Sequence, residues 1–255
     1  MNKLLTFIIS LLLIGCCGET ELPESGLKGE VKMLTEYNVR IINDSINNPI
    51  RDTLSVVKRY YNERNQIIER NQVYTFTDET MDIIYEYNRC NRLEKEQVKM
   101  SFDSSAVDVD YIYKGSLLNK TISESSRDSI TFEQIGLYKY NSDKKLIENS
   151  VAQLFIDLKT GDTIKNSLQI DKYNQNEVVM ESEIKYQEKP SENGRTEYFY
   201  KSEDLIKTLE YNQNDSLIAT YRFEYKKDQI GNWIERSTYK NDKLNNIKIW
   251  NIVYK

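Results

Sequence analysis

Five short triplets are the part of this chain best suited to chemistry. In each, Asp is followed by Ser or Thr and then by an apolar residue, and the hydroxyl groups belong to Ser45, Thr53, Ser129, Thr163 and Ser216. Such hydroxyls are candidate acceptors for O-linked sugars, and we predict glycosylation at these five positions. The alternative is ordinary turn chemistry, because an Asp side chain readily bonds nearby backbone amides before a strand.

Composition excludes several classes of catalyst. The 255 residues contain no histidine, which removes Ser-His-Asp and Cys-His catalysis and histidine-ligated zinc or haem. Carboxylates are common, but no pair stands out by its setting. Acidic and basic residues are interleaved at a net charge of -5, without the basic stripe that nucleic-acid binding requires. We therefore expect no enzyme, no cofactor or metal, and no nucleic-acid partner.

The N-terminus carries an export pattern. Lys3 precedes an apolar run, residues 4–14, that is too short for the roughly 20 residues of a membrane-spanning helix. The run ends in Leu13-Ile14-Gly15-Cys16, which resembles the lipobox of bacterial lipoproteins. Cys17 is a competing attachment site, and a buried cysteine in an ordinary helix is the alternative.

The resemblance implies a signal peptide over 1–15, lipid on Cys16, and a flexible acidic tether over 16–29. It places the protein in the bacterial cell envelope, anchored in a membrane through lipid. We expect the outer membrane, on its periplasmic or surface face. The five triplets are also similar to the acceptor pattern of a general bacterial O-glycosylation system for exported proteins.

The 19 tyrosines follow a repeat. The recurring phrase is an aromatic residue, any residue, Tyr, Asn or Lys, a few polar residues and an apolar pair. Its anchor tyrosines are Tyr61, Tyr87, Tyr113, Tyr140, Tyr173, Tyr200, Tyr211, Tyr225 and Tyr239. A step of about 13 residues corresponds to one strand and one turn, and a step of about 26 to two, so the spacing indicates an array of hairpins.

Alternation within the repeats predicts strands. Leu217, Ala219, Tyr221, Phe223 and Tyr225 share one face when the chain is extended. Residues 80–100 and 203–209 also fit short helices by propensity, but we expect strands there too.

We predict one all-β domain over residues 30–255. It is an antiparallel meander of about sixteen strands, built from tyrosine-anchored hairpin repeats. With 39% hydrophobic and 29% charged residues, a thick core is hard to fill. A curved, largely single-layer sheet or open half-barrel fits better.

Residues 225–236 resemble the Tyr-Asp-x-x-Gly-Asn repeat of YD/RHS-type proteins, and two residues separate Asp228 from Gly231. The opening segment, residues 26–32, is similar to the start of the folded part in small lipoproteins built from such repeats. Elsewhere in the chain Asn or Lys replaces the Asp, and the Gly-Asn pair is missing. The resemblance implies a β fold and an envelope location, and little about function.

Two functions remain from the sequence. The first is a non-enzymatic, lipid-anchored scaffold that binds an envelope protein or a glycan through its tyrosine-rich face, with Tyr221, Phe223 and Tyr225 as the binding face. The alternative is a periplasmic carrier that holds a lipid or other apolar ligand in a half-barrel groove. The candidate lining of that groove is Ala152, Leu154, Ile156 and Leu158.

Overall fold

The computed structural model describes residues 27–43, 49–103, 106–127 and 129–255. These residues form sixteen β-strands and one short 3-10 helix, η1 (Pro190–Glu192). The strands are β1 (Val31–Asn43), β2 (Pro49–Tyr61), β3 (Ile67–Tyr74), β4 (Thr80–Tyr87), β5 (Leu93–Met100), β6 (Ala106–Lys114), β7 (Leu117–Arg127), β8 (Ile130–Tyr140), β9 (Leu146–Asp157), β10 (Thr163–Tyr173), β11 (Val179–Tyr186), β12 (Gly194–Lys201), β13 (Asp204–Asn212), β14 (Leu217–Lys227), β15 (Trp233–Lys240) and β16 (Lys243–Tyr254).

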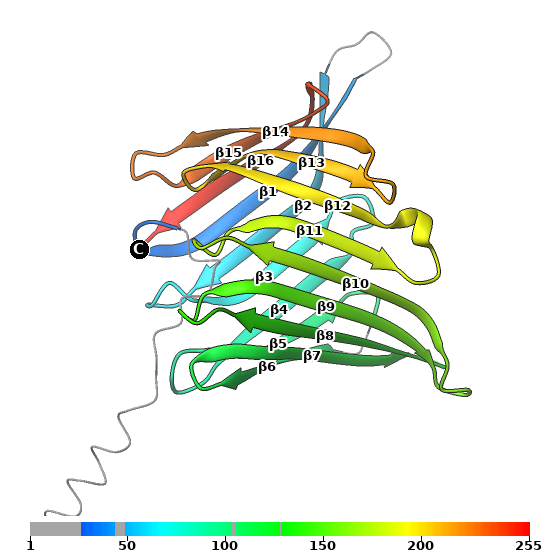
Figure 1. Ribbon diagram of the computed structural model, residues 1–255. Coiled ribbons are helices and arrows are strands. Elements are labelled where there is room, and N and C mark those ends of the chain that lie inside the picture. Colours follow the sequence, from blue (N-terminus) through cyan, green and yellow to red (C-terminus); the bar gives the residue numbers. More distant parts are fainter. Residues whose placement is uncertain (1–26, 44–48, 104–105, 128) are drawn as a thin grey trace, which may run out of the picture.

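Each strand pairs antiparallel with the next, and β1 also pairs with β16, so the sheet closes into a barrel (Figure 1). The predicted antiparallel meander of about sixteen strands is confirmed, including strands over 80–100 and 203–209. The predicted curved, largely single-layer sheet or open half-barrel is wrong. The two outermost strands meet in register from Leu34 opposite Ile252 to Arg40 opposite Asn246. The repeat specifies each hairpin locally, and the same hairpins are compatible with an open or a closed sheet.

Six of the turns share one geometry. The side-chain oxygen of the first residue accepts the amide protons two and four residues later, and the residue three positions on has a positive φ. The first residues are Asn62, Asn88, Asn141, Asn174, Asn212 and Asp228. Asn therefore replaces the Asp of the YD-like phrase without changing the turn, because both side chains present the same acceptor.

Tyrosines tie neighbouring hairpins together at one end of the barrel. The hydroxyl of Tyr113 donates to the carbonyl of Leu93 at 2.8 Å, and Leu93 is the residue that pairs with Tyr87. The bonds from Tyr87 to Ile67, Tyr140 to Leu118 and Tyr225 to Leu205 repeat this pattern at 2.7–2.9 Å. We call this the tyrosine end, which lies to the left in Figure 1, and its opposite the distal end.

Tyr211 and Tyr239 do not belong to this series. Each lies on the other face of the sheet, where the guanidinium of Arg195 or Arg222 covers the ring at 4.2 and 4.0 Å. Without these two residues, the repeat is two strands long throughout. The shorter spacing of the anchor tyrosines after Tyr200 therefore does not divide the sheet into two parts.

The two faces of the sheet differ in the burial of charged side chains. Glu36 keeps 10% of its side-chain surface exposed, whereas Lys139 and Lys226 on the other face keep 64% and 69%. Side chains on the concave side of a closed barrel crowd together, and those on the convex side splay apart. The face of Glu36 is therefore the lumen face, and the face of the two lysines is the outer wall.

The barrel has little packed core. Only nine apolar side chains of the described residues are buried, and Val31 alone among them is fully covered. A barrel of sixteen strands is wide enough to enclose water rather than a filled interior. Most lumen-facing side chains are accordingly half-buried.

We call the junction of β1 and β16 the seam. Two asparagine side chains hold the start of β1 there. Asn232 accepts from the amide of Lys28 at 2.6 Å and donates to its carbonyl at 2.8 Å. Asn65, in the β2–β3 turn, accepts from the amide of Val31 and donates to the carbonyl of Gly29. The β2–β3 and β14–β15 turns thus bind the same segment, which fixes the register of closure.

Replacing Asn232 with Ala should lower the free energy of unfolding by about 2 kcal/mol, because it removes both bonds and leaves partly buried backbone groups of Lys28 without these partners. Urea denaturation measures this. Asn214→Ala, in an exposed turn, is the matched control and should change stability by about 0.5 kcal/mol or less. Equal effects of the two substitutions would contradict the role of Asn232 in closure.

Candidate functional site

The predicted binding face is brought together on the lumen side of β14. Tyr221, Phe223 and Tyr225 are half-buried there rather than forming an exposed outer row. The guanidinium of Arg236 lies 5.4 Å from the ring of Phe223, and the ammonium of Lys240 lies 5.3 Å from that of Tyr221. The three aromatic rings therefore face the cavity of the barrel with cations beside them.

Further tyrosines line the lumen on β6, β8 and β12. Tyr111 donates to Glu96 at 2.6 Å, and burial, followed by the charge of Glu96, raises the pKa of its phenol strongly. Burial also raises the pKa values of Tyr138 and Tyr198, and raises that of Tyr140 to about 12. These phenols stay protonated at physiological pH and act as hydrogen-bond donors beside apolar rings.

A charged cluster lies on the lumen face at the seam. Glu36 on β1 accepts from Lys248 at 2.9 Å, from the indole of Trp250 at 3.0 Å and from Arg59 at 3.3 Å. Burial by itself raises the pKa of Glu36, but attraction and hydrogen bonding from Lys248, with help from Arg59 and Trp250, outweigh it. The pKa of Glu36 therefore lies below its ordinary value of 4.5.

Polar atoms without partners gather beside this cluster. They are Asn38 Oδ1, Arg70 Nε, Arg236 Nε, Thr238 Oγ1 and Asn246 Oδ1, all on the lumen face of β1, β3, β15 and β16. The sequence analysis missed this group. Its members come from both ends of the chain, and only closure of the barrel makes them neighbours. A buried polar atom without a partner costs about 1–3 kcal/mol, so a concentration of them on one surface requires an explanation.

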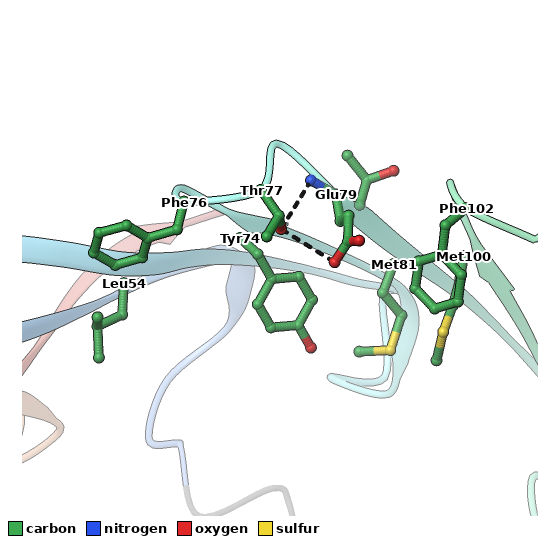
Figure 2. Close-up of a pocket in the computed structure, with 9 residues that line it drawn as sticks. Leu54, Tyr74, Phe76, Thr77, Glu79, Met81, Met100 and Phe102 are labelled. Atoms are coloured by element: carbon green, nitrogen blue, oxygen red, sulfur yellow. Dashed lines mark hydrogen bonds between the residues drawn. The ribbon is translucent and has the colours of Figure 1, made fainter.

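A separate apolar pocket of about 510 Å³ opens between β2, β3, β4 and β5 at the distal end. Its apolar lining consists of Leu54, Tyr74, Phe76, Met81, Met100 and Phe102. Figure 2 shows Leu54, Tyr74 and Met81 pointing to the same side of the sheet, with Thr77 and Glu79 at the edge. Register places Tyr74 opposite Ser55, which faces Asn38, so the pocket adjoins the seam cluster on the lumen side.

The outer wall carries charged pairs from the tyrosine end to mid-height. Lys139–Glu148, Lys172–Glu181 and Lys226–Glu235 pair near the tyrosine end, and Lys185–Glu183 and Arg222–Glu224 pair near mid-height. A barrel wall that faces lipid needs an apolar band, and charges there are costly. These pairs favour water over lipid at this part of the wall.

The predicted lining of an apolar groove lies on the wrong side. Ala152, Leu154 and Ile156 share the outer face of β9 with Glu148, and Leu158 is exposed beyond the strand. The lumen side of β9 carries Phe155 instead, whose ring lies 5.0 Å from that of Phe132. Alternation correctly grouped Ala152, Leu154 and Ile156 but could not show which face is concave.

The predicted glycosylation sites that the structure describes lie toward the distal end. Ser129 and Ser216 are in the β7–β8 and β13–β14 turns, Thr163 begins β10, and Thr53 is near the start of β2. Thr163 and Ser216 are exposed. Ser45 and the lipidation site Cys16 lie outside the described residues.

The described residues contain no group of three or more Cys, Asp or Glu placed to hold a metal ion. In the same part of the chain, no helix has the length and apolar character needed to cross a membrane.

Comparison with known proteins finds only structural likeness. No family model and no curated protein match the chain. A porin-like protein from Bacteroides uniformis ATCC 8492 matches with a TM-score of 0.54 and 11% identity, over 88% of this chain and 96% of that one. Another from Bacteroides vulgatus ATCC 8482 matches with a TM-score of 0.52 and 12% identity, over 86% and 97%. The fold of the present chain is similar to that of these two porin-like proteins. At such identities the likeness extends to the fold alone.

The crystal structure of TcdB2-TccC3-TEV is also matched, with 11% identity over 76% of this chain and 12% of that one. Its TM-score of 0.21 is too low to support an argument about fold. The YD/RHS-like character of the repeat stays a prediction from the residues.

Glu36 generates a testable pH dependence. Because the pKa of its carboxyl is lowered in the folded state, its stabilisation is present above about pH 4.5 and is lost as the pH falls through the folded value. Glu36→Gln should lower the free energy of unfolding by about 2 kcal/mol at pH 7 and flatten its decline below pH 4.5.

Urea denaturation from pH 3 to 7 measures both effects of Glu36→Gln. Glu235→Gln, which breaks an outer-wall pair with Lys226, is the control, with an expected loss of about 0.5 kcal/mol or less. An unchanged pH profile for Glu36→Gln would rule out the seam carboxylate as the source of the dependence.

Peptide mass spectrometry of the protein from its own host tests the modification sites. We expect sugar mass increments first on the exposed Thr163 and Ser216, and an acylated N-terminal cysteine at Cys16. Unmodified peptides at all five triplets would refute glycosylation, and an unprocessed N-terminus would refute the lipid anchor.

Proposed function

We propose that this protein is a non-enzymatic, lipid-anchored β-barrel of the bacterial cell envelope that binds a glycan in its lumen. The observation that carries the proposal is the position of the tyrosine-rich face. That face lines the lumen of the closed barrel, where aromatic rings alternate with hydrogen-bonding groups. Sugars offer the matching chemistry, with an apolar ring face for stacking and hydroxyls for polar contacts.

Closure of the barrel supports one of the two partner classes that the sequence left open. A folded protein cannot lay a surface against a concave face enclosed by sixteen strands. A linear or branched glycan is thin enough to enter. The lumen therefore favours the glycan over the envelope protein as the ligand of this face.

Two features support the proposed location. The charged outer wall favours water over lipid, and the lipobox-like Cys16 supplies attachment without a membrane-spanning wall. The start of β1 is held at the tyrosine end, so the tether leaves the barrel there. We propose that the barrel sits beside the outer membrane with its distal end pointing away from the lipid.

A second candidate function is transport of an apolar ligand, which the distal pocket favours. Its volume of about 510 Å³ falls within the range of small-molecule sites, and two methionines give it an adaptable wall. In this reading the cargo sits at one mouth of the barrel rather than in a half-barrel groove.

A glycan array probed with the full chain tests the leading proposal. We expect binding to at least one glycan, and Phe223→Ala should weaken it about five- to tenfold by removing a lumen stacking surface. Phe199→Ala, an exposed residue of the outer wall, is the matched control and should leave binding unchanged.

Binding that falls equally in both variants would place the glycan outside the lumen. No glycan binding, together with uptake of an apolar fluorescent probe that Met81→Asp abolishes, would favour the carrier.

A further inference from the structure

Two like-charged pairs face each other across strands on the lumen side of the seam. Arg59 on β2 lies directly opposite Arg70 on β3, and Arg236 on β15 lies directly opposite Lys248 on β16. Like charges in directly opposed positions destabilise a sheet. Their occurrence on both sides of β1 needs a compensating negative charge.

The seam supplies that charge only in part. Glu36 engages one cation of each pair, Arg59 through one oxygen and Lys248 through the other. Arg70 and Arg236 take part in none of the ion pairs found among the described residues. Arg70 donates to the neutral Gln72 at 2.7 Å, and Arg236 lies over the ring of Phe223.

The Nε atoms of both arginines are buried without an acceptor, as is that of Arg92 in the β4–β5 turn. Asp52 is paired with Arg40 on β1. Besides that pair, the lumen face of β15, β16, β1, β2 and β3 carries five cations, Arg236, Lys240, Lys248, Arg59 and Arg70, against Glu36. The guanidinium groups of Arg70 and Arg236 are available for anions.

Acceptors for hydroxyl groups lie close to Arg236 on β15, β16 and β1. Thr238 is 5% exposed and its Oγ1 has no partner, and Asn246 Oδ1, directly opposite, has none either. Asn38 Oδ1, opposite Lys248, is the third such atom. The combination asks for a ligand with negative groups and several hydroxyls, which a neutral glycan or a simple anion does not satisfy.

We propose that this seam surface binds an acidic glycan, with anionic groups on Arg70 and Arg236 and hydroxyls on Thr238, Asn246 and Asn38. This deepens the proposed lumen function and rests on it. The unpartnered atoms are covered in the ligand-free arrangement, so the long side chains of Arg236 and Lys248 swing toward the ligand as it binds. Phe223, beneath Arg236, offers the stacking surface for a sugar ring.

The test uses the full chain on an array of matched glycans: oligogalacturonates with their methyl esters, and sulfated glycosaminoglycan fragments with their desulfated forms. We expect the acidic member of at least one pair to bind at least tenfold more tightly than its neutral counterpart. The double variant Arg70→Gln and Arg236→Gln should remove that preference. Arg222→Gln, on the outer wall, is the control and should keep it.

Loss of binding through misfolding is separable from loss of the site. Because Arg70 opposes Arg59, Arg70→Gln should maintain or raise the melting temperature of the ligand-free protein. Arg70→Lys with Arg236→Lys keeps the charge but loses the Nε donors, and should bind acidic glycans with intermediate strength.

The outcomes distinguish this inference from the function on which it rests. Binding of neutral and acidic members with equal strength, or acidic preference that survives the double glutamine variant, overturns the seam site and leaves the glycan-binding lumen in place. Absence of binding to every glycan overturns both.

Discussion

The pairing of β1 with β16 is the interaction on which the rest of the structure depends. It joins strands from the two ends of the chain and removes the free edges that a sixteen-stranded meander would otherwise present. It also creates an inside. With so few buried apolar side chains, the barrel relies on this continuous ladder of backbone hydrogen bonds, on the tyrosine hydroxyls at one end and on the asparagine side chains that grip residues 28–31.

Closure also gives the two faces of each strand different environments. Charged residues on the outer wall form ion pairs that are exposed to water and contribute little to stability. On the lumen face, side chains of like charge lie opposite each other on neighbouring strands, and some polar atoms have no hydrogen-bond partner. Both features lower stability. Local conflict of this kind is typical of surfaces kept for a ligand. The seam therefore closes the barrel, and it is also the surface where unfavourable contacts indicate a ligand.

Much of the fold follows from residues that are close in sequence. The tyrosine spacing, the Asn-type turns and the alternation along segments such as 217–225 correctly predict strands, hairpins and their order. Even the YD-like turn survives replacement of Asp by Asn, since both side chains bond the same two amides. The one-strand steps at Tyr211 and Tyr239 were a readable signal that these residues lie at the opposite end from the other anchors.

The sequence does not show which face of each strand is concave in the barrel. Period two shows that Leu154 and Ile156 share a face, but their neighbours across the barrel decide that it is the convex one. Likewise, nothing local to Glu36, Arg70 or Arg236 marks them as a cluster, because they come from opposite ends of the chain. Alternation places Tyr221, Phe223 and Tyr225 on one face, as the structure does. That this face lines a lumen depends on closure of the barrel, through contacts such as that between Lys28 and Asn232, which are 204 residues apart in the sequence.

Hydrogen–deuterium exchange of the full chain, followed by mass spectrometry, tests closure most directly. If the barrel is closed, peptides from β1 and β16 are protected as strongly as those from β8 and β9, because every one of these strands is bonded on both sides. Rapid exchange confined to β1 and β16, with protection retained in the middle of the chain, would show an open sheet with two free edges. That result would contradict the lumen, the seam cluster and the functions assigned to them.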